Sequence, residues 1–135
     1  MSTTIQPRTL TVVVLDVDGT LTHQDHQVHD DATAQAAIRA AIGKNTTTLR
    51  KVGSLYDMDV WAAAHTGPDE APANIPANCF VAIQGDLETL AMGRVAFVTT
   101  DPDGQYVSPS TMQFGSLSTL AKKWKLLKES PQQEA

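Results

Sequence analysis

Residues 11–22 have the sequence Thr-Val-Val-Val-Leu-Asp-Val-Asp-Gly-Thr-Leu-Thr, and this stretch decides the fold. Its β-branched first half predicts a buried strand over residues 9–15. The residues that follow allow two interpretations. In the first, the strand delivers Asp16 and Asp18 to a loop where the two carboxylates can hold a magnesium ion and attack phosphate. In the second, Asp18-Gly19 is the tight turn of a β-hairpin. In the second case the polar residues 20–29 form an exposed return strand.

Further along the chain, two helices are expected. Asp30 or Asp31 is a good N-cap for an alanine-rich helix over residues 32–42, and Gly43 is expected to end it in the left-handed conformation. A second, amphipathic helix is predicted over residues 116–129, because leucine, alanine and tryptophan recur there on one helical face.

The remaining segments predict strands and one long loop. We expect strands at 46–52 and 57–64 with Gly53-Ser54 near their turn, and a third strand at 94–100. A turn at 101–104 and a return strand at 105–108 follow. Prolines and a glycine predict a loop over residues 66–78, whereas residues 79–90 fit no single pattern.

Taken as two hairpins, the whole chain has an α+β layout. The expected fold is a small antiparallel or mixed sheet with hairpins, covered by the alanine-rich helix and the C-terminal amphipathic helix. We expect a flexible N-terminus at 1–8, a single α+β domain at 9–129 and a disordered tail at 130–135.

Composition excludes several classes of function. The net charge of −5 argues against nucleic acid as a partner, and no apolar run approaches the ~20 residues that span a bilayer, so no membrane partner is expected. One cysteine, Cys79, rules out an internal disulfide and fits a reducing cytoplasm. Neither a signal-peptide core nor a phosphate-binding glycine loop is present.

The string Leu15-Asp16-Val17-Asp18-Gly19-Thr20 resembles the first motif of the haloacid-dehalogenase phosphohydrolases. The resemblance implies a Mg²⁺-dependent phosphatase in which Asp16 is the nucleophile and Asp18 the general acid, both near the metal. Thr99 and Lys122 are the candidates for its phosphate-binding hydroxyl and its lysine. The acidic motif that should complete the magnesium site has no counterpart after Lys122.

The order of motifs over residues 10–108 resembles a family of small domains of unknown function from actinobacteria and their phages. The motifs are Asp18-Gly19, Ile42-Gly43, the prolines and asparagines of 72–78, and the strand that runs into Asp103-Gly104. The resemblance implies a mobile-element origin, in which small acidic proteins bind and disable host or defence proteins. On this basis we expect a non-catalytic protein without a cofactor that binds a host protein in the host cytoplasm.

Candidate binding residues lie in two segments. The loop 66–78 contributes Asn74 and Asn78, and the last helix contributes Trp124 with Lys122, Lys123 and Lys125; this helix is also a candidate for homo-oligomer formation. Two alternatives remain open. Arg50, Lys51 and Arg94 with the loop 66–78 could sequester a nucleotide signal, and the histidines at 23, 26 and 29 could bind a metal.

Overall fold

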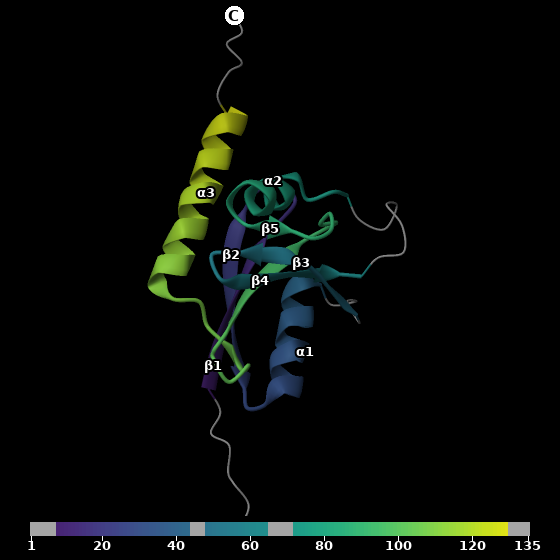
Figure 1. Cartoon of the computed structure of the whole chain (residues 1–135), viewed down its shortest axis with the longest axis vertical. Helices are drawn as coiled ribbons and strands as arrows, with labels where there is room; N and C mark the ends of the chain where they lie inside the picture. The colour runs from purple at the N-terminus through teal and green to yellow at the C-terminus, as the bar shows by residue number, and fades with distance from the viewer. Residues whose placement is uncertain (1–7, 44–47, 65–71, 130–135) are drawn as a thin grey trace, which may run out of the picture.

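The computed structural model describes residues 8–43, 48–64 and 72–129. Seven strands form a sheet in which, among the described residues, every pair is antiparallel. Its order is β2-β1-β6-β4-β3-β5, with β7 paired to β6 (Figure 1). The strands are β1 (Arg8–Leu15), β2 (Leu21–Val28), β3 (Leu49–Leu55), β4 (Met58–Ala63), β5 (Asp86–Leu87), β6 (Val95–Thr100) and β7 (Tyr106–Val107). This is the predicted α+β class.

The N-terminal segment forms the predicted hairpin. Strand β1 pairs with β2 in one continuous register, from Leu15 opposite Leu21 to Arg8 opposite Val28. On its other side, β1 pairs with β6, so that β1 is an internal strand and β2 is the edge. The edge position of β2 explains the polar composition of residues 20–29, because an edge strand with one solvent-exposed face does not need an apolar sequence.

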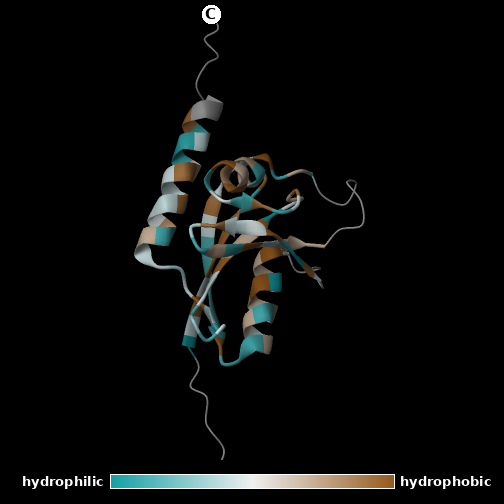
Figure 2. Cartoon of the chain, in the orientation of Figure 1, coloured by the Kyte–Doolittle hydropathy of each residue, from teal (hydrophilic) through white to brown (hydrophobic). Residues whose placement is uncertain are grey.

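Two cores lie on opposite faces of the sheet. Helix α1 (Asp31–Ile42) covers one face, where Ile38 and Ala41 pack against Val12 and Val14. Helices α2 (Ile75–Gln84) and α3 (Thr111–Glu129) cover the other, where Val81 and Leu117 pack with Val13 and Leu15. Figure 2 shows apolar and polar residues alternating along α1 and α3, as expected for helices with one face on a sheet.

The predicted stripe of α1 is confirmed, and Asp30 caps the helix: its side chain accepts a hydrogen bond from the Thr33 N–H. The predicted left-handed end is wrong. Gly43 does end α1 and donates its N–H to the Arg39 carbonyl, but its φ of 172° is extended backbone. The stripe of α3 is confirmed at Leu117, which is buried, and at Trp124, which packs against the same core.

Several predicted boundaries are wrong. Strand β3 runs through Gly53-Ser54, and the turn to β4 is made by Tyr56 and Asp57, both with positive φ (52° and 65°). Gly53 lies within β3, next to β5. A side chain at this position would collide with the Asp86 carbonyl oxygen on β5, so the close pairing of these strands requires glycine here. The predicted strand start at 46–47 lies outside the described residues.

The loop predicted over 66–78 ends earlier than expected. Residues 66–71 lie outside the described ranges, but α2 begins at Ile75, with Asn74 as its N-cap and Pro76 in its first turn. Proline is compatible with that position because the first helical N–H groups have no partner within the helix. The undecided segment 79–90 divides between α2 and β5.

Helix α3 begins five residues before the predicted Ser116. Ser110 precedes it and forms a capping box with Gln113: the Gln113 N–H donates to Ser110 Oγ, and the Ser110 N–H donates to Gln113 Oε1. The flexible ends predicted at 1–8 and 130–135 lie outside the described residues, except that Arg8 starts β1. None of the helices in the described ranges combines the length and apolarity that a bilayer crossing requires.

Candidate binding groove

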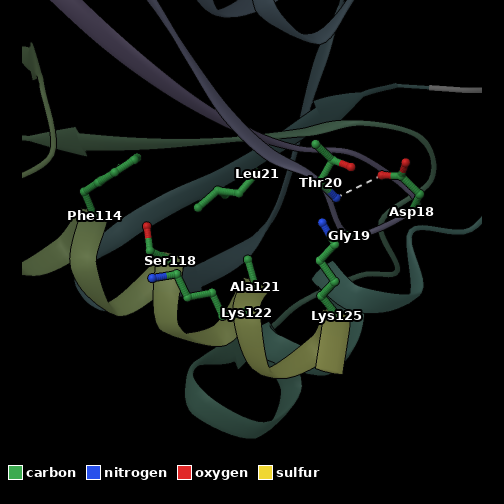
Figure 3. Close-up of a pocket in the computed structure, with 9 residues that line it drawn as sticks. All are labelled: Asp18, Gly19, Thr20, Leu21, Phe114, Ser118, Ala121, Lys122 and Lys125. Carbon is green, nitrogen blue, oxygen red and sulfur yellow. Dashed lines mark hydrogen bonds between the residues drawn. The ribbon is translucent and has the colours of Figure 1, made fainter. Parts of the chain in front are cut away.

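A groove of about 540 Å³ lies between the β1–β2 turn and helix α3 (Figure 3). It joins two segments that are about a hundred residues apart in the chain. We call it the turn–helix groove, and its lining residues are Asp18, Gly19, Thr20, Leu21, Phe114, Ser118, Ala121, Lys122 and Lys125. Its volume falls within the range of small-ligand and peptide pockets.

The lining combines apolar surface with charge. Leu21, Phe114 and Ala121 supply the apolar part. Lys122 and Lys125 are exposed and three residues apart on α3, so that both side chains lie on the same side of the helix. Figure 3 shows the Lys125 side chain rising from α3 toward the turn. The groove therefore offers two cations against the one carboxylate of Asp18.

Close contact between the turn and α3 fixes the width of the groove. Gly19 has a φ of 91°, and a β-carbon there would collide with Cδ1 of Trp124 and lie 2.9 Å from its Nε1. The Trp124 ring in turn meets Phe80 of α2 edge-on, with centroids 6.2 Å apart. The Trp124 ring therefore lies between the hairpin turn and α2. The turn and α3 can approach this closely because Gly19 has no side chain.

The Asp-x-Asp-Gly string of the turn occurs twice in the chain, with the same backbone geometry. In the first copy the Asp16 N–H donates to the Thr20 carbonyl (2.9 Å) and the Gly19 N–H to the Asp16 carbonyl (3.0 Å). Residues 101–105 make the equivalent bonds at 2.9 Å each, and Gly104 has a φ of 85°. Aspartate at the first position satisfies nearby N–H groups in both turns. A hairpin turn thus accounts for the motif at 16–19.

The candidate catalytic residues only partly converge. Asp18 and Lys122 share the turn–helix groove. Asp16 instead pairs with Arg94 (Oδ2 to Nη2, 3.1 Å). Thr99 lies four residues beyond Val95, which pairs with Leu15, and this places it roughly 13 Å further along β6. The Thr99 hydroxyl donates to Gln113 Oε1 there.

The two candidate asparagines hold backbone together. Asn74 is fully buried; its Nδ2 donates to the carbonyls of Leu15 (3.0 Å) and Gly93 (2.8 Å), and its Oδ1 accepts from the Ala77 N–H. Asn78 exchanges two hydrogen bonds with the backbone of Ala91. We therefore assign both a structural role, and sequence reasoning missed it because their partners come from distant segments.

The other candidates are distributed as follows. Lys123 is exposed on α3 but does not line the groove, and Trp124 faces the core. Lys51 pairs with Asp59 (3.4 Å) and Arg94 with Asp16, so these cations lie in separate ion pairs. His23 and His26 point to opposite faces of β2, as their partners Val13 and Leu10 do. Within the described ranges, no three His, Cys, Asp or Glu side chains cluster as a metal site would require.

Comparisons of the chain with protein families, with curated proteins and with solved structures found no match.

Proposed function

We propose that this is a non-catalytic binding protein whose turn–helix groove holds an acidic, partly apolar segment of a partner protein. The observation that carries the proposal is the placement of Lys122 and Lys125 beside the apolar surface of Leu21 and Phe114. Apolar area supplies binding free energy, and a pair of cations at the rim favours carboxylates over other side chains.

The partner we propose is a protein of the host cell in which a phage or other mobile element is expressed. This part of the proposal rests on the sequence resemblance to actinobacterial and phage domains. The hairpin that carries part of the resemblance belongs to the same sheet that the alanine-rich helix packs against, and its turn lines the groove. No cofactor is part of the proposal.

The test compares two lysines on the same helix. Lys122 lines the groove, whereas its neighbour Lys123 is also exposed but is not among the lining residues. Immobilised wild type, Lys122→Glu and Lys123→Glu proteins are incubated with actinobacterial lysate, and retained proteins are quantified by mass spectrometry.

A protein retained by wild type and Lys123→Glu, and lost with Lys122→Glu, is the expected result. Both variants change the net charge equally, so only the position of the charge differs. Equal retention by all three proteins would place the binding surface elsewhere and overturn the assignment of the groove.

A further inference from the structure

We propose that the edge of β2, which no other described strand pairs with, pairs with β2 of a second copy of this chain, forming a dimer with one continuous sheet. This inference does not require that the groove bind a partner. Strand β2 ends the sheet, is eight residues long and pairs with β1 without a bulge. It contains neither proline nor lysine, the residues that usually protect a free edge. The opposite edge, β5, is only two residues long.

The hydrogen bonds of the hairpin show which backbone groups face outward. The Asp16 N–H donates to the Thr20 carbonyl across the hairpin, and bonded pairs recur at every second residue. The pair Thr11–Asp25 falls between bonded pairs. Consistent with this, the Thr11 N–H donates to Ser108 Oγ (2.8 Å), away from β2. The outward N–H and C=O groups are therefore those of Leu21, His23, Asp25 and Gln27.

These outward groups select a register for the second copy. In an antiparallel dimer they must oppose one another, which allows a two-fold axis at any residue of the strand. An axis at Asp25 sets two carboxylates opposite each other, which is destabilising. An axis at Gln24 sets His23 opposite Asp25 of the second copy, twice, and uses all four outward residues on each strand. An imidazole N–H can donate a hydrogen bond to a carboxylate, so the pairing of histidine with aspartate favours the axis at Gln24.

Both side chains are available for this pairing. His23 and Asp25 are exposed and lie on the same face of the sheet, opposite Val13 and Thr11. The Thr11 hydroxyl donates to Asp25 Oδ1 (2.8 Å), which orients the carboxylate. The His23 ring meets Phe114 edge-on at 5.8 Å, which orients the imidazole. An interface of two strands buries little area, so we expect a reversible, concentration-dependent dimer.

Exchange of the two residues tests the register. Sedimentation velocity over a concentration series compares wild type with His23→Asp, Asp25→His and the double variant. Wild type is expected to approach twice the monomer mass of 14.5 kDa. Each single variant sets like residues opposite each other and should raise the dissociation constant about tenfold. The double variant restores the histidine–aspartate pairs and should dimerise as wild type does.

Three results would overturn the proposal: a wild-type protein that stays monomeric at every concentration, single variants that dimerise as wild type does, or a folded double variant that does not recover. Circular dichroism of each variant separates a lost interface from a lost fold. The edge substitutions leave Lys122 and Lys125 unchanged, so failure here is distinguishable from failure of the groove.

Discussion

Gly19 is the residue on which the geometry of the hairpin and helix α3 depends most directly. It has a left-handed backbone and no side chain, and Trp124 occupies the space where a β-carbon would lie. Gly104 has nearly the same φ, 85° against 91°, but nothing lies within 4 Å of its β-carbon position. A substitution at Gly104 therefore tests the cost of a positive φ alone, whereas one at Gly19 adds the collision with Trp124.

We predict that Gly19→Ala lowers the free energy of unfolding by about 3 kcal/mol and Gly104→Ala by about 1 kcal/mol. Both variants force alanine into a positive φ, and only Gly19→Ala must also displace the Trp124 ring. Urea denaturation of both variants and wild type measures the difference. Equal losses would mean that Trp124 does not hold the turn against α3.

Among the described residues, Asn74 is the one buried polar side chain, and it joins three segments. We predict that Asn74→Ala costs about 2–4 kcal/mol, because it removes a helix cap and the two hydrogen bonds that this fully buried side chain donates to the carbonyls of Leu15 and Gly93. The control, Asn78→Ala, breaks two bonds to the Ala91 backbone but removes no helix cap and a side chain that is only half-buried, and it should cost about 1 kcal/mol. Thermal unfolding of the pair measures both; a smaller loss for Asn74→Ala would contradict its structural role.

At the scale of elements, the helices and strands with a periodic apolar pattern were predicted, whereas the first residues of α2 and α3 were not. The stripe of α1 and the strand at 95–100 were predictable because every repeat of the pattern is local. Helix α2 was missed because Pro76, taken as a loop residue, lies in the first turn of a helix. The start of α3 was missed although Ser110 and Gln113 have the spacing of a capping box, because the apolar repeat that placed the helix begins only at Leu117.

The cap of α1 predicts a pH dependence. The Thr33 backbone N–H, and then the Thr33 hydroxyl, lower the pKa of Asp30 from its ordinary value of 3.8. A pKa lower in the folded than in the unfolded state means that ionised Asp30 stabilises the fold above pH 3.8 and loses this effect as the pH falls through the folded value.

Asp30→Asn isolates that charge, because asparagine keeps the capping oxygen. We expect wild type to be the more stable protein at neutral pH, and the difference to shrink when chemical denaturation is repeated below pH 3.8. A difference that is constant across this range would show that the charge of Asp30 does not contribute to the cap.

At the scale of the whole molecule, the fold class followed from the order of hairpins and helices, but the groove did not. Lys122 and Asp18 are separated by about a hundred residues, and no local pattern says which face of α3 meets the hairpin turn. The burial of Asn74 was hidden for the same reason, because its carbonyl partners come from β1 and from the segment before β6.

The topology also separates the two interpretations of residues 11–22. The phosphohydrolase resemblance requires Asp16 at the carboxyl end of a parallel strand, with the hydroxyl residue at the end of a neighbouring one. Here β1 is antiparallel to both its neighbours. The carboxyl end of β1 therefore lies beside the start of β6, and Thr99, near the carboxyl end of β6, lies far from Asp16. The geometry instead assigns Asp16 to a turn and to an ion pair with Arg94.

Asp16→Asn therefore distinguishes a turn residue from a nucleophile. The Asp16–Arg94 pair is about 40% exposed on both sides, so its loss should change the free energy of unfolding by less than about 1 kcal/mol. Phosphate release from a broad phosphoester panel, with and without Mg²⁺, should stay at background for wild type and variant alike. Mg²⁺-dependent turnover that disappears in Asp16→Asn, with the fold retained, would make Asp16 a nucleophile and replace the binding function proposed for this protein.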